Sequence, residues 1–167
     1  VIGYIMNNFF TTFVLFVFAS MLIWSGCDQK RKPGKGMDLL KYGIPYTVMA
    51  PKETKASKIG GGQMIDLKLS DGKTYDVLIF MKGAETKHVD RLKQFRKEEV
   101  SFYPNFKKIV EEYNEGFLYE IYSSTGETSY AFYAIKIVGD NEIDFMSGNN
   151  RDFTEVEVKD MIKTILY

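Results

Sequence analysis

Two reactive side chains are nearly missing from this chain, which has a single cysteine, Cys27, and a single histidine, His88. One cysteine cannot form an internal disulfide. A lone histidine needs an oriented partner for acid–base catalysis, and its neighbours Glu85 and Asp90 are ordinary on a charged helix surface. We therefore expect His88 to be a solvated surface residue, and the sequence predicts no catalytic set.

Charge is missing from the first part of the chain. Residues 1–29 contain no Lys, Arg or Glu and only one acidic residue, Asp28. From Asp28 onward the chain carries all 22 basic and 22 acidic side chains, so that part is neutral overall. A neutral domain has no net field that attracts nucleic acid, and we predict no nucleic-acid partner.

An apolar run covers residues 9–24, and Ser25, Gly26 and Cys27 follow it at once. The run is shorter than the roughly 20 residues that cross a membrane as a helix, and it fits the core of a signal peptide. The small residues before the cysteine suit a processing enzyme that must hold extended backbone. This arrangement resembles the bacterial lipobox, whose cysteine receives a diacylglyceryl group and becomes the new N-terminus. The resemblance implies a lipoprotein precursor with a signal peptide over 1–26 and lipidation at Cys27.

The resemblance also implies a location: the cell envelope, on the inner or the outer membrane, with the lipid on Cys27 as the anchor. Two or more acyl chains hold a protein stably on a bilayer. The alternative is an uncleaved membrane helix over roughly residues 2–26. The basic residues from Lys30 to Lys35 would then keep the following domain in the cytoplasm. This alternative needs no role for Cys27.

The remainder divides into a tether and one domain. Residues 27–41 form the lipid anchor and a basic tether, in which Pro33, Gly34 and Gly36 break regular structure. From Tyr42 to Tyr167 the chain is long enough for a single core. Strands are predicted over 42–49, in a hairpin over 64–81, and over 116–123, 129–138 and 141–146. Residues 52–59 are predicted to be a polar loop and Gly60-Gly61-Gly62 a joint.

Alternating apolar residues favour a hairpin with a three-residue turn, Ser70-Asp71-Gly72, which places Leu67 opposite Tyr75. Residues 84–99 are predicted to form a charged surface helix on the sheet. Residues 106–113 fit either a helix or a strand, and we favour the strand. The capping box Thr154 to Glu157 predicts a final helix that buries Val158, Met161, Ile162 and Ile165.

This order of elements predicts an α+β fold, a mainly antiparallel sheet flanked by helices. Three segments, YGIPYTVMAP, GFLYEIYSSTG with YAFYAIKIVGDNEIDF, and FTEVEVKDMIKTI, resemble the α/β sandwich family of the photosystem protein PsbP and the Ran-binding Mog proteins. The resemblance implies an accessory or binding protein rather than an enzyme. It carries over no functional residue.

Other features give weak chemical signals. Asp140, Glu142 and Asp144 alternate, but the EF-hand positions for glycine and glutamate hold Phe145 and Arg151, so we expect a polar edge and no metal. The glycines at 60–62 lack the lysine of a phosphate-binding loop, and no cofactor is predicted. Tyrosines are frequent in the centre of the domain, and we expect them to pack on strands: Tyr113, Tyr119, Tyr122, Tyr130 and Tyr133.

We therefore predict a lipid-anchored envelope protein whose small domain binds or assists a protein partner without catalysis. The alternative in another class is an envelope enzyme whose site is assembled from Asp, Glu and Tyr side chains and the lone His88.

Overall fold

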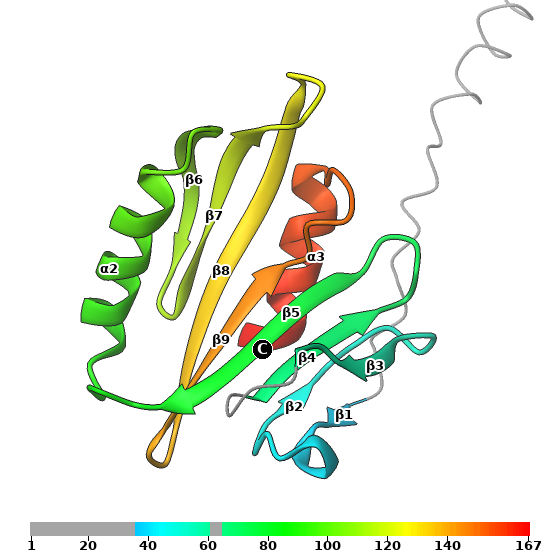
Figure 1. Ribbon diagram of the computed structural model, residues 1–167, viewed down its shortest axis with the longest axis vertical. Helices are drawn as coiled ribbons and strands as arrows, with labels where there is room; N and C mark the ends of the chain where they lie inside the picture. The colour runs from blue at the N-terminus through cyan, green and yellow to red at the C-terminus, as the bar shows by residue number, and fades with distance from the viewer. Residues whose placement is uncertain (1–35, 61–64) are drawn as a thin grey trace, which may run out of the picture. The chain divides into compact units, whose positions relative to one another are not determined.

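The structure is a computed structural model, which describes residues 36–60 and 65–167. The predicted signal peptide, Cys27 and most of the predicted tether lie outside the described residues. The elements follow in the order β1 (Met37–Asp38), a 3₁₀ helix (Leu40–Tyr42), β2 (Thr47–Val48), β3 (Lys55–Lys58), β4 (Ile65–Ser70), β5 (Asp76–Gly83), α2 (Val89–Ser101), β6 (Phe106–Tyr113), β7 (Gly116–Tyr122), β8 (Thr128–Val138), β9 (Asn141–Ser147) and α3 (Glu155–Leu166) (Figure 1).

A seven-stranded antiparallel sheet forms the centre of the described domain, with its strands in the order β3-β4-β5-β9-β8-β7-β6. A small separate sheet pairs β1 with β2. Helix α2 connects β5 to β6, and α3 follows β9 (Figure 1). The predicted α+β class, a mainly antiparallel sheet flanked by helices, is therefore confirmed.

The two helices cover opposite faces of the sheet. Successive side chains of a strand point to opposite sides, so neighbouring residues of β8 identify the helix on each face. On β8, Phe132 belongs to the core cluster that contains Met161 of α3. The next residue, Tyr133, belongs to the cluster that contains Val100 of α2. The long central strand thus supplies side chains to two hydrophobic layers. Among the described residues, no helix is both long enough and apolar enough to cross a membrane.

Helix α3 has the predicted start and the predicted buried face. The Thr154 hydroxyl accepts a hydrogen bond from the Glu157 N–H, and the Glu157 carboxylate accepts one from the Thr154 N–H at 2.9 Å. Each member of this capping box satisfies a backbone N–H that the first turn leaves without a helical partner. The predicted apolar face is buried in the core: Val158, Met161, Ile162 and Ile165.

The hairpin β4–β5 exists, but the predicted register is wrong. Leu67 lies opposite Ile79 rather than Tyr75. Asp71 widens the turn, because its Oδ1 accepts hydrogen bonds from the three backbone N–H groups of Lys73, Thr74 and Tyr75. The register differs by an even number of residues, so the apolar side chains still face the core. Gly72 has a φ of 74°, as expected for this turn.

The fold begins earlier than residue 42, the predicted start of the domain. Leu39 is fully buried, and its N–H donates to the Tyr46 carbonyl at 3.0 Å. The strand predicted over 42–49 is reduced to β2, because Gly43, with a φ of 90°, ends the 3₁₀ helix just before it. The apolar side chain of Leu39 therefore belongs to the core and not to a solvated tether.

The polar loop predicted over 52–59 contains a strand, β3, which pairs with β4 as an edge of the sheet. Its sequence, Lys-Ala-Ser-Lys, has no alternation of apolar residues that could predict a strand. This edge strand is held by backbone hydrogen bonds to β4 rather than by burial of its side chains. Residues 106–113 form β6, which confirms the strand. The predicted surface helix is α2, and it starts at Val89 because His88 before it has an extended backbone.

Candidate functional site

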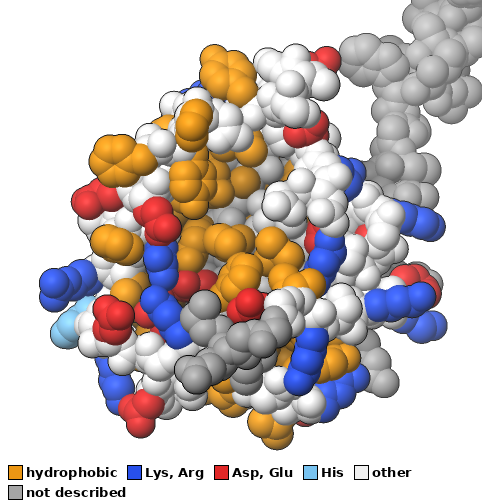
Figure 2. Space-filling model, in the orientation of Figure 1, with side chains coloured by type: hydrophobic (Ala, Val, Ile, Leu, Met, Phe, Trp, Pro, Cys, Tyr) orange, Lys and Arg blue, Asp and Glu red, His pale blue; other side chains and the backbone are white. Residues whose placement is uncertain are grey.

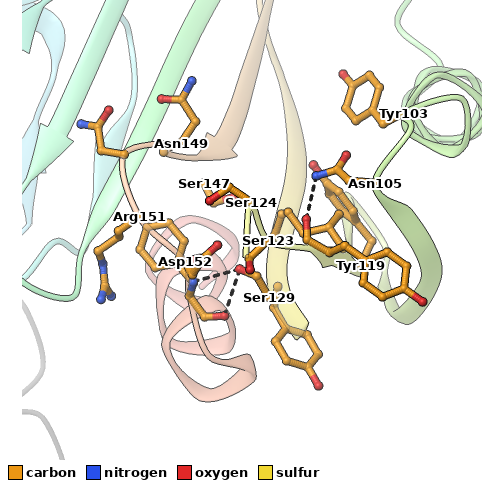
Figure 3. Close-up of a pocket in the computed structure, with 17 residues that line it drawn as sticks. Tyr103, Asn105, Tyr119, Ser123, Ser124, Ser129, Ser147, Asn149, Arg151 and Asp152 are labelled. Carbon is orange, nitrogen blue, oxygen red and sulfur yellow. Dashed lines mark hydrogen bonds between the residues drawn. The ribbon is translucent and has the colours of Figure 1, made fainter. Parts of the chain in front are cut away.

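A groove of about 480 Å³ lies at one end of the sheet (Figure 3). Three connections form its rim: the α2–β6 loop, the β7–β8 turn and residues 147–153, which lead from the last residue of β9 toward α3. The ends of β7 and β8 supply its floor. Its lining combines aromatic rings with neutral polar groups, among them Tyr103, Asn105, Tyr119, Ser123, Ser129 and Asn149.

The rim segment 147–153 is held to β8 by hydrogen bonds. The Ser129 hydroxyl accepts from the Phe153 N–H at 3.0 Å, and the Tyr130 N–H donates to the Phe153 carbonyl at 3.0 Å. The Phe153 ring is buried in the core beneath α3. This side of the groove is therefore formed before any ligand arrives, as is usual for binding sites.

Gly148 brings the same segment close to β5. Its N–H donates to the Asp76 carbonyl at 2.8 Å, and a β-carbon placed on Gly148 would lie 2.4 Å from the Asp76 carboxyl carbon. The Asp76 side chain is buried and pairs with Lys68 at 2.9 Å. Only glycine permits this approach, and it sets the path of the rim above the sheet.

Exposed aromatic residues stand beside the groove. The exposed fraction is 84% for Phe102, 42% for Tyr103 and 48% for Tyr122. The Asn105 amide donates to the Tyr122 carbonyl at 3.1 Å, which ties the α2–β6 loop to the end of β7. Figure 2 shows further hydrophobic side chains exposed on the face of the sheet beside α2. Aromatic side chains that stay exposed in a folded domain are typical of interaction surfaces.

The chemistry of the groove suits binding. Its hydroxyl, amide and phenol groups donate and accept hydrogen bonds without net charge. The charged residues in its lining are Arg151 and Asp152, and Arg151 is already paired with Glu157 at 2.7 Å. His88 does not line the groove. Stacking on the rings and neutral hydrogen bonds are the interactions that it offers a ligand.

A buried ionic cluster lies apart from the groove, between α2 and the sheet. Arg96 Nη2 contacts Asp144 Oδ2 at 2.9 Å and Glu142 Oε1 at 3.1 Å. Glu142 also pairs with Lys82 at 3.3 Å and is fully buried. Burial raises the pKa of Asp144, and the nearby Tyr133 hydroxyl and the Arg96 guanidinium oppose that rise.

This cluster corrects the expected polar edge at Asp140, Glu142 and Asp144. Strand β9 lies between β5 and β8 in the middle of the sheet, so Glu142 and Asp144 are buried beneath α2. Asp140 lies in the β8–β9 turn, where it is exposed and pairs with Lys87 at 3.0 Å. In residues 36–60 and 65–167, no group of three or more His, Cys, Asp or Glu side chains is arranged to hold a metal ion.

The other residues singled out from sequence are distributed over the domain. His88 is exposed just before α2, as predicted. Tyr119 and Tyr133 are packed in the layer under α2, as expected, and the ring of Tyr133 is stacked with that of Phe117. Tyr113 and Tyr130 are half-buried and pack against the core cluster beneath α3, as expected, and Tyr130 also borders the groove. Tyr122 is exposed and lines the groove instead, which the packing interpretation did not include.

Sequence reasoning missed the groove because its lining comes from four separate segments. One local signal was present: the polar run Asn149-Asn150-Arg151-Asp152 between the last strand and the capping box. Such a run indicates a surface connection, but only the sheet order places it beside Tyr103 and Tyr122.

Comparison of the chain with models of protein families, with curated proteins and with solved structures finds no match. The described residues define an α+β sandwich domain with a preformed groove of aromatic and neutral polar groups.

Proposed function

We propose that this protein is a lipid-anchored protein of the cell envelope whose α+β domain binds a protein partner in the groove, without catalysis. The observation that carries the binding role is the groove beside Phe102, Tyr103 and Tyr122, which remain exposed where a folded domain ordinarily buries aromatic rings. Aromatic side chains contribute most of the binding energy in many protein interfaces.

The anchor rests on the sequence around Cys27, which follows an apolar run and the small residues Ser25 and Gly26. We also propose that the domain belongs among PsbP/Mog-like sandwiches. An antiparallel sheet with α2 on one face and α3 on the other supports this assignment.

Mass spectrometry of the purified protein and replacement of the cysteine test the anchor together. Cys27 should begin the mature chain and carry acyl groups. The variant Cys27→Ser should lose the acyl groups and appear either in the soluble fraction or as the unprocessed precursor. An unmodified Cys27 with the preceding residues intact would contradict the anchor and support the membrane-helix alternative.

Site-specific photo-crosslinking in intact cells tests the groove. A photoreactive amino acid at Tyr103 should give one discrete protein adduct. The matched position is Tyr167, which is 86% exposed and lies at the C-terminus, away from the groove (Figure 1). An adduct at both positions, or at neither, would argue against a partner in the groove. Replacing Phe102 and Tyr122 by alanine should weaken the Tyr103 adduct at unchanged protein level.

A further inference from the structure

The charges of this neutral protein are unevenly divided along the described chain. Residues 36–75 hold six lysines and four acidic residues, whereas residues 76–167 hold 12 basic and 17 acidic residues. The first group contains β1 to β4 and the turn that leads to β5. Its excess of positive charge is invisible in the net charge of the whole chain.

The lysines of the two parts also differ in their partners. Of the 12 basic residues after Asp76, ten form ion pairs within the described chain. In residues 36–60 and 65–75 the only such pair is that of Lys68 with Asp76. Five exposed lysines there have no ion pair with any described residue: Lys41, Lys52, Lys55, Lys58 and Lys73. A lysine without an acidic partner among the described residues is available to an anionic partner outside the protein.

These five lysines, named here the basic face, lie on adjoining elements. Lys41 and Lys52 line one shallow hollow between the 3₁₀ helix and the segment before β3. Lys55 and Lys58 lie on β3, the outermost strand of the sheet, and Lys73 lies in the β4–β5 turn. Figure 2 shows Lys and Arg side chains gathered on the side of the molecule where Figure 1 places β1 to β4.

The basic face is also the part of the fold nearest in sequence to the proposed anchor. Nine residues separate Cys27 from Met37, and this stretch spans at most about 35 Å when fully extended. Lys30, Arg31, Lys32 and Lys35 lie in that interval. Whatever holds Cys27 at a bilayer therefore keeps this face within reach of the lipid headgroups.

We propose that the basic face rests on anionic lipid headgroups and orients the domain, so that the groove faces away from the membrane. This inference rests on the proposed membrane anchor. Lysines near an anionic leaflet are attracted to it within about one Debye length. The groove lies at the end of the sheet near the β7–β8 turn, and β1 to β3 lie at another side of the domain (Figure 1). A partner in the groove would then be met from the aqueous phase.

A fluorescent probe on the full chain in lipid nanodiscs tests the orientation. Ser57→Cys places the probe on β3, and Ser124→Cys places it at the groove; both residues are exposed. The discs contain a headgroup-quenching lipid and either phosphatidylcholine alone or phosphatidylcholine with phosphatidylglycerol. With the anionic lipid, quenching at position 57 should rise by about threefold, while position 124 stays unchanged. Raising salt from about 20 to about 500 mM shortens the Debye length from about 20 to about 4 Å and should remove the rise.

Two matched variants separate the basic face from charge in general. Lys52→Gln with Lys55→Gln and Lys58→Gln should abolish the rise at position 57. Lys87→Gln with Lys108→Gln and Lys163→Gln removes the same charge elsewhere and should leave it intact. The proposal would be overturned if quenching at position 57 did not depend on lipid charge, or if the two triple variants reduced this quenching equally. So would displacement from anionic discs by transfer RNA at equal charge concentration, since the face would then prefer nucleic acid.

The proposed anchor can fail separately. The mass of the Cys27 peptide from the same preparation tests the anchor, whereas quenching of the fluorescent probe tests the basic face. An unmodified Cys27 with a lipid-dependent probe would reject the lipoprotein and keep the orientation.

Discussion

Arg96 links α2 to the sheet through two carboxylates of β9, and all three side chains are largely removed from water. The Arg96 guanidinium lies over the Tyr133 ring, 5.5 Å from its centroid, in the same layer. A buried ion pair adds little stability compared with an apolar pair, but loss of one partner leaves the other charge buried without compensation. From sequence, Arg96 belonged to a charged surface helix, and its partners Glu142 and Asp144 were expected at a polar edge.

The variant Arg96→Ala should lower the free energy of unfolding by about 3–5 kcal/mol, because Glu142 and Asp144 lose their main counter-charge. Urea denaturation followed by circular dichroism measures the loss. Arg91→Ala is the control on the same helix, since Arg91 is exposed and pairs with no described residue; its effect should stay within about 0.5 kcal/mol. Equal losses in the two variants would contradict the buried cluster.

Asp71 predicts a pH dependence. Partial burial opposes its ionisation, but the hydrogen bonds from the N–H groups of Tyr75, Lys73 and Thr74 outweigh burial and lower its pKa. A carboxyl whose pKa is lowered by folding stabilises the protein above its unfolded pKa of about 3.9, and this stabilisation is lost as pH falls through the folded pKa.

Asp71→Asn should therefore cost about 1 kcal/mol at pH 6, since the amide retains an acceptor but not the charge. The difference from the unmodified protein should shrink when denaturation is repeated below pH 3. A cost that is the same at both pH values would show that charge has no part in this turn.

At the scale of elements, strand order and side-chain alternation explain most of the architecture. Strong periodic patterns predicted α3, the β4–β5 hairpin and β8 with β9, since each buries a regular face. Strand β3 was missed, and the predicted register of β4–β5 was wrong. Both depend on backbone hydrogen bonds and on side chain-to-backbone bonds, which leave no periodic trace in the sequence.

The pairing of β7 with β8 depends on a glycine. A β-carbon on Gly116 would lie 2.5 Å from the Tyr133 carbonyl oxygen, so the strands must separate to admit it. Gly116→Ala should cost about 1–3 kcal/mol of unfolding free energy by overpacking. Gly83→Ala is the matched change at the end of β5, where no atom lies within 4 Å, and it should cost little. Thermal unfolding of both variants compares them, and an equally stable Gly116→Ala would contradict the close pairing.

At the scale of the whole molecule, neutrality conceals a division between a basic face and an acidic remainder. The neutral net charge led to the prediction of no nucleic-acid partner. That prediction considers only the field averaged over the whole protein and not the local charge of one surface. The basic face has a local positive potential, and we propose that this potential attracts anionic lipid headgroups. Orientation and anchoring together would present the groove to partners in the envelope.

The topology of the domain gives the last prediction. A membrane-impermeant amine reagent, applied to cells whose outer membrane, where there is one, has been made permeable, should label Lys163, because this residue is exposed and the lipoprotein interpretation places the domain outside the inner membrane. A cytoplasmic protein of the same cells is the control and should remain unlabelled. Labelling that requires lysis would support the uncleaved membrane helix and a domain in the cytoplasm.

Sequence alone was sufficient for the α+β class, the capping box and the buried face of α3, because these are local patterns of polarity and hydrogen bonding. It also supplies the whole argument for Cys27. The groove, the buried Arg96 cluster and the basic face required the tertiary structure. The groove and the Arg96 cluster join residues that are distant along the chain, and only the order of strands in the sheet brings them together. The basic face lies within residues 36–75, and the folded structure shows which of the lysines there lack an ion pair with any described residue.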